Sequence, residues 1–192
     1  MAKTYYHATN IKDIDVLKPH ISNHNKSLIY FSSKRENVLV YLSNAIEKFC
    51  KETNFKHEGY FTPWGPYGFT EDGLIQLEEY YPNALEETYK GVSGYIYSTT
   101  NVENIDSLSN IKDVYVTDKE TKIENVEYII DAYEEILKAE QEGLIKIVRY
   151  EEFIKVKKDW LYKTIQNEYD NEQSKPEYIY FLKSKFPFIK LW

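Results

Sequence analysis

Two short segments near the start of the chain decide the expected fold: Tyr5-Tyr6-His7-Ala8-Thr9 and Leu28-Ile29-Tyr30-Phe31-Ser32. Both are rich in aromatic and β-branched residues, which favour strands. Directly after the second segment, Ser33 and Glu36 form a capping-box pattern, which is typical of a helix start. The order therefore predicts two strands followed by a helix, with a histidine in the first strand and a tyrosine in the second.

The remaining elements follow from periodicity and capping residues. The helix after Ser33 is expected to run to about Glu52, because apolar residues recur with a helical period at Val38, Leu42, Ala45, Ile46 and Phe49. Further strands are expected at 74–79, 94–98, 114–117, 122–129 and 144–150. Further helices are expected at 83–91, 131–142, 159–168 and 176–185. Strands and helices without a regular alternation predict an α+β fold.

The length of the chain and its charge limit the possible domain organisation and the possible binding partners. With 192 residues the chain is one domain, or one domain with an appendage. After about residue 153 the pattern changes from mixed strands and helices to helices alone. We therefore expect a main domain over 1–153 and a helical C-terminal extension over 154–192. The net charge of −7 makes nucleic-acid binding unfavourable. Residues 155–192 nevertheless hold eight lysines and five acidic residues, so this segment would contact either an acidic partner or, as we favour, the acidic body of its own chain.

The number and spacing of cysteines and histidines limit which cellular compartment and which cofactors are expected. The single cysteine, Cys50, excludes an internal disulfide framework and fits the reducing cytoplasm. No signal peptide and no apolar run long enough for a bilayer are found, which predicts a cytoplasmic protein without a membrane partner. The four histidines lack the spacing and companions of a metal site, so no metal is expected.

One glycine- and proline-rich segment carries many aromatic residues. Residues 53–73 read as a loop, and its centre, 60–69, alternates large aromatic side chains with glycine hinges. Such a segment either acts as a lid for a substrate or a protein acceptor, or folds onto its own aromatic side chains. The sequence leaves these two alternatives equal.

The two opening segments resemble those of ADP-ribosyltransferase-like proteins of the His-Tyr group. Here the segments are Tyr6-His7-Ala8-Thr9 and Ile29-Tyr30-Phe31-Ser32, with a helix following. Residues 1–153 also resemble a set of uncharacterised bacterial or phage-type proteins with the same opening, which implies no function. The first resemblance implies split mixed or antiparallel sheets flanked by helices, and NAD as the substrate.

The resemblance also implies roles for individual residues. His7 would hold the ribose of the adenosine half of NAD, and Tyr30 would stack on the nicotinamide. Both side chains are then expected to open into one cleft on adjacent strands. The expected binding residues are His7, Ala8, Thr9, Tyr30, Ser32, Tyr41 and Asn44, the last two being neighbours on the following helix.

These enzymes usually supply a glutamate on a later strand, near 114–117 in this chain. No glutamate occurs there, and Asp113 or Thr117 is expected to take its place opposite His7 and Tyr30. A carboxylate would stabilise positive charge in the transition state, whereas a threonine would bind ribose without that help. Three functions follow: NAD-dependent ADP-ribosyl transfer or NAD hydrolysis, a catalytically silent nucleotide- or ADP-ribose-binding module, or a protein-interaction domain.

Overall fold

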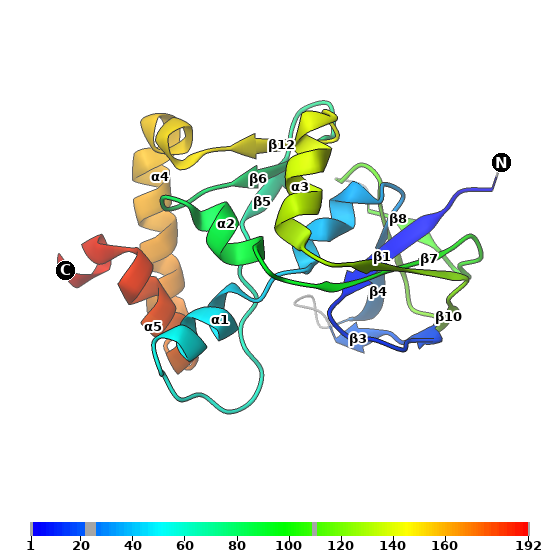
Figure 1. Cartoon of the computed structure of the whole chain (residues 1–192), viewed down its shortest axis with the longest axis horizontal. Helices are drawn as coiled ribbons and strands as arrows, with labels where there is room; N and C mark the ends of the chain where they lie inside the picture. Colours follow the sequence, from blue (N-terminus) through cyan, green and yellow to red (C-terminus); the bar gives the residue numbers. More distant parts are fainter. Residues whose placement is uncertain (1, 22–25, 109–110, 192) are drawn as a thin grey trace.

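The computed structural model describes residues 2–21, 26–108 and 111–191 (Figure 1). The strands are β1 (Tyr5–Thr9), β2 (Val16–Leu17), β3 (His20–Ile21), β4 (Ser27–Ser32), β5 (Tyr67–Phe69), β6 (Ile75–Glu78), β7 (Gly94–Thr99), β8 (Asp106–Ser107), β9 (Val114–Thr117), β10 (Thr121–Lys122), β11 (Asn125–Ile129) and β12 (Ile145–Val148). The helices are η1 (Glu36–Tyr41), α1 (Ala45–Glu52), α2 (Ala84–Tyr89), α3 (Ala132–Gln141), α4 (Tyr150–Asn171), α5 (Pro176–Lys185) and η2 (Pro187–Leu191).

The predicted opening strands lie side by side in the largest sheet. Its order is β11-β7-β1-β4-β9-β8, with β3 pairing on β4, and all of these pairs are antiparallel. A smaller sheet has the order β12-β6-β5, in which β12 and β6 are parallel. The predicted α+β class is confirmed, with mainly antiparallel sheets and flanking helices.

The large sheet and the C-terminal helices occupy opposite ends of the molecule (Figure 1). One hydrophobic core lies between this sheet and η1, α2 and α3, and it includes Ala8, Leu39, Ile96 and Ile136. A second core joins α1 to α4 and α5 through Ile46, Trp64, Phe153, Leu161 and Phe181. The described part of the expected extension, 154–191, is mainly helical, and its helices share this second core with residues from the first half of the chain. The expected boundary at 153/154 falls inside α4, which begins at Tyr150.

The single helix expected up to Glu52 is wrong. The structure has the short 3₁₀ helix η1, a break at 42–44, and then α1, which starts at Ala45. The apolar residues before the break pack in the first core and those after it pack in the second, so one straight helix cannot serve both. Ser33 does not act as the cap, because its hydroxyl donates to Asp113 instead.

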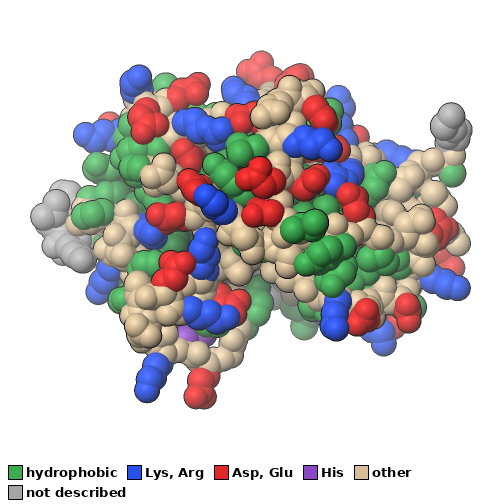
Figure 2. Space-filling model, in the orientation of Figure 1, with side chains coloured by type: hydrophobic (Ala, Val, Ile, Leu, Met, Phe, Trp, Pro, Cys, Tyr) green, Lys and Arg blue, Asp and Glu red, His purple; other side chains and the backbone are tan. Residues whose placement is uncertain are grey.

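Surface charge is mixed, and lysines of the C-terminal helices contact the acidic body. Lys157 pairs with Glu78 at the kink in α4, and Lys185 pairs with Glu87 on α2. Figure 2 shows acidic and basic side chains interspersed, with hydrophobic side chains gathered over β11 and β7. Among the described residues, none of the helices has both the length and the apolar character needed to span a membrane.

Candidate functional site

His7 and Tyr30 lie on adjacent strands and are joined by a hydrogen bond. The His7 ring nitrogen Nδ1 is 2.9 Å from the Tyr30 carbonyl oxygen. A carbonyl can only accept, so Nδ1 carries the proton. Burial lowers the pKa of His7, against the opposing effect of this hydrogen bond, and the ring is therefore neutral at pH 7. In this tautomer Nε2 is a hydrogen-bond acceptor.

The expectation that His7 and Tyr30 open into one cleft from the same face is wrong. Tyr6 pairs with Ser32, and side chains alternate between faces along a strand. The His7 ring accordingly packs edge-on against Phe31, at 6.1 Å between ring centroids. Tyr30, one residue away from Phe31, lies on the opposite face and borders a small cavity with Ser32 and Tyr41.

The side chains of Asp113 and Thr117 both make hydrogen bonds to other segments of the chain. The Thr117 hydroxyl donates to the Glu103 carbonyl at 2.6 Å and accepts from the Lys119 amide at 3.1 Å. The Asp113 carboxylate accepts from the Ser33 hydroxyl at 2.8 Å and pairs with Lys34. These contacts fix the two ends of β9, and the structure gives neither side chain a contact with His7 or the Tyr30 ring.

The expected binding residues Thr9, Tyr41 and Asn44 meet at one groove of about 780 Å³. It lies beyond the end of β1, where η1 breaks and α1 begins. The aromatic segment predicted as a lid forms its other wall. The lining residues are Thr9, Asn10, Val40, Tyr41, Ser43, Asn44, Glu47, the run from Gly59 to Gly65, and Tyr67. His7, Ala8, Tyr30 and Ser32 do not line it.

Aromatic side chains and unpaired polar atoms characterise this groove. The Tyr41 and Tyr67 hydroxyls are 3.1 Å apart, and their rings meet edge-on. About half of the Tyr41 residue is exposed, yet desolvation of its hydroxyl and the adjacent Tyr67 hydroxyl raise the pKa of Tyr41, so the hydroxyl stays protonated at neutral pH. Asn44 Oδ1 and Trp64 Nε1 are buried and have no hydrogen-bond partner within the described chain. Since buried polar atoms are normally paired, these two suit a bound ligand or water.

The aromatic wall packs against the C-terminal helices, not onto its own side chains alone. The Trp64 ring contacts Tyr178, Phe181 and Phe186, with ring centroids 5.1–6.2 Å away. Thr62 donates from its hydroxyl to the buried Glu177 carboxylate at 2.8 Å. Burial would raise the pKa of Glu177, but the hydrogen bonds from Thr62 and from the backbone amide of Glu177 itself together outweigh it, so the pKa is lowered and the group stays charged.

Glu47 is a lining residue that the sequence prediction missed. It lies three residues after Asn44, on the first turn of α1, and its Oε1 accepts from Lys51 at 2.6 Å. Oε2 makes no hydrogen bond within the described residues. The spacing of three residues from Asn44 was the only available signal, because it places the two side chains on one face of a helix. The groove therefore contains a carboxylate, although not the expected one.

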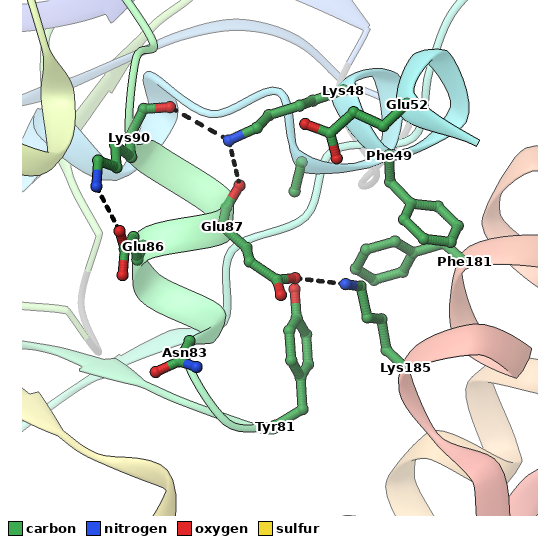
Figure 3. Close-up of a pocket in the computed structure, with 11 residues that line it drawn as sticks. Lys48, Phe49, Glu52, Tyr81, Asn83, Glu86, Glu87, Lys90, Phe181 and Lys185 are labelled. Carbon is green, nitrogen blue, oxygen red and sulfur yellow. Dashed lines mark hydrogen bonds and ion pairs between the residues drawn. The ribbon is translucent and has the colours of Figure 1, made fainter. Parts of the chain in front are cut away.

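A second pocket of about 340 Å³ lies between α1, α2 and α5 (Figure 3). Its three lysines are engaged. Lys48 donates to the carbonyls of Glu87 and Lys90, while Lys90 and Lys185 pair with Glu86 and Glu87. These contacts tie α5 to the body of the chain. With its ammonium groups already paired, this pocket is a weaker candidate for a ligand site than the groove.

No cluster of three or more potential metal ligands occurs among the residues that the structure describes. Comparison of the chain with protein-family models, with curated proteins and with solved structures found no match. The groove itself and the resemblance of the opening segments are therefore the features that bear on function.

Proposed function

We propose that the groove binds a nucleotide, with NAD as the leading ligand. The observation that carries this proposal is the convergence of Thr9, Tyr41 and Asn44 on one groove with an aromatic wall. These three residues come from separate parts of the chain. Thr9 belongs to the segment that resembles ADP-ribosyltransferase-like proteins, and the helical spacing of Tyr41 and Asn44 made them candidates for lining a cleft. The volume of about 780 Å³ lies within the usual range for small-molecule sites.

The chemistry of the lining suits the parts of a dinucleotide. Tyr41 and Tyr67 offer aromatic surfaces for a nicotinamide or adenine ring. The unpaired Asn44 Oδ1 suits a donor such as a ribose hydroxyl or a carboxamide N–H, while Trp64 Nε1 suits an acceptor.

His7 has a place in this proposal although it does not line the groove. It is two residues before Thr9 on β1, and residues two apart on a strand share a face and lie about 6.6 Å apart. His7 therefore lies one step along the strand from the groove, with its ring against Phe31. Its role in the proposal is to hold β1 to β4 beside the groove, through the hydrogen bond from Nδ1 to the Tyr30 carbonyl.

Replacement of Tyr41 by alanine should weaken NAD binding about tenfold. Stacking of a base on an aromatic side chain contributes about 1–3 kcal/mol, and Tyr41, like Tyr67, borders both the groove and the cavity at Tyr30. Isothermal titration with NAD and, separately, with ADP-ribose measures the loss. Tyr128→Ala is the matched control, because Tyr128 is 55% exposed, much like Tyr41 at 48%, and lies on β11 outside the groove.

Two results would contradict the proposal. One is equal NAD affinity in wild type, Tyr41→Ala and Tyr128→Ala, which would place any binding elsewhere. The other is a wild-type protein that binds neither NAD nor ADP-ribose at millimolar concentration. The interaction-domain alternative would then take precedence, with the exposed aromatic segment around Tyr60 as its contact surface.

A second candidate function, cleavage of the bond between nicotinamide and ribose, is favoured by one observation. Glu47 places a carboxylate at the groove, beside Asn44. NAD hydrolysis or ADP-ribosyl transfer develops positive charge on the ribose, which a carboxylate stabilises. Asp113 and Thr117, the residues expected in this role, are instead engaged at the ends of β9.

A further inference from the structure

Helix α5 fixes the aromatic wall of the groove through one of its faces. Glu177, Tyr178, Tyr180 and Phe181 all contact the segment between Phe55 and Trp64. The Phe55 and Tyr180 rings stack at 4.3 Å, and Trp64 packs between Tyr178 and Phe181. The segment has no regular secondary structure between 55 and 66, so these contacts and not a backbone ladder hold it.

Glu177 is the polar centre of this contact. The residue is 2% exposed. Its Oε1 accepts from the Thr62 hydroxyl at 2.8 Å and lies 3.4 Å from the Thr62 amide nitrogen. Its Oε2 lies 3.8 Å from His57 Nδ1. A buried charge needs such partners, because removing a carboxylate from water is costly. The carboxylate thus holds the segment at Thr62, directly after the groove residues 59–61, and the His57 ring lies beside it.

We infer that Glu177 is a positioning residue for the groove: through Thr62 its buried carboxylate fixes the wall against which the ligand binds. This inference rests on the proposed function of the groove as a nucleotide site. Glu177 does not line the groove, so it acts on the ligand only through the wall. The consequence is that ligand binding and the docking of α5 are coupled, so the C-terminal segment supports the binding site without lining it.

The test compares Glu177→Gln with wild type in the full-length chain. Glutamine keeps the size but loses the charge-assisted hydrogen bond, so we expect about fivefold weaker NAD binding by titration. Without NAD, amide hydrogen exchange of 55–66 should become about tenfold faster, while β1 and β7 exchange as in wild type. Glu168→Gln is the matched control. Glu168 accepts from the Tyr178 hydroxyl on α5 but makes no contact with Thr62 or His57.

Thr62 supplies a second, independent variant. Thr62 itself lines the groove, so its variants are compared by hydrogen exchange and not by NAD affinity. Thr62→Ser keeps the hydroxyl donor and should leave the exchange of 55–66 as in wild type, whereas Thr62→Val should speed it as Glu177→Gln does. A purely structural loss would not be rescued by serine in this way. If Glu177→Gln fails to fold, the serine and valine pair carries the test, because valine removes only one buried hydroxyl.

The outcomes separate this inference from the proposed function. Unchanged exchange of 55–66 in both Glu177→Gln and Thr62→Val would overturn the inference. Faster exchange with unchanged NAD affinity would also overturn it, while the proposed function would survive. If the wild-type protein binds no NAD, the proposed function fails, and hydrogen exchange alone decides whether Glu177 positions the wall.

Discussion

Trp64→Ala should destabilise the protein by about 3–5 kcal/mol, the range for removing a large aromatic side chain from a core. Trp64 is 8% exposed and contacts rings from three C-terminal positions. It comes from the loop between α1 and β5, so its loss opens a cavity where the two halves of the chain meet. Urea unfolding followed by circular dichroism measures the change in the free energy of unfolding.

Trp160→Ala is the matched control for this prediction. Trp160 is 48% exposed and packs edge-on against Tyr80 and Phe153, so its removal should cost about half as much or less. A Trp64→Ala cost no larger than that of Trp160→Ala would contradict the packing described here. Two separate transitions in wild type would mean that the second core, around Trp64, unfolds independently of the large sheet.

Much of the fold followed from local patterns in the sequence. The alternating segments at β1, β4, β6, β7, β9 and β12 and the capped helix α3 are where they were predicted, because each carries its own periodic signal. Asp131 caps α3 by accepting from the Tyr133 amide, as its position before the apolar run indicates. The break at 42–44 had no such signal, because both halves of the interrupted helix follow one apolar period.

The faces of His7 and Tyr30 illustrate what a sequence cannot supply. Whether the two side chains share a face depends on the register between β1 and β4, and a shift of one residue reverses the answer. The observed register pairs Tyr6 with Ser32, so the side chains of Tyr30 and His7 lie on opposite faces of the sheet. Register is set by packing over the whole sheet, and neither segment encodes it alone.

The groove shows the same division between local and long-range information. Tyr41 and Asn44 were expected to be neighbours on one helix, whereas in the structure they flank its break. They line one groove because the wall from Gly59 to Gly65 closes over the break, held there by α5. That closure joins segments more than a hundred residues apart, and no local pattern in either segment predicts it.

Glu47→Gln should reduce the rate of nicotinamide release about 10²–10³-fold while leaving the affinity for NAD nearly unchanged. In the reaction the bond from ribose C1′ to the nicotinamide nitrogen breaks, and its electron pair leaves with nicotinamide. Water or an acceptor group then bonds to C1′ and loses a proton to solvent. The Glu47 carboxylate would stabilise the positive charge on the ribose, and glutamine keeps its shape without that charge. Chromatographic assay of free nicotinamide measures the rate.

Glu52→Gln is the matched control for Glu47. Glu52 ends the same helix and borders the second pocket instead of the groove. The lost ion pair between Glu47 and Lys51 is exposed and worth only about 0.3–0.5 kcal/mol, so the variant should remain folded. Equal release by wild type, Glu47→Gln and Glu52→Gln would exclude Glu47 as the catalytic carboxylate. NAD binding without release in wild type would instead identify a silent nucleotide-binding module, in which Glu47 borders the ligand without acting on it.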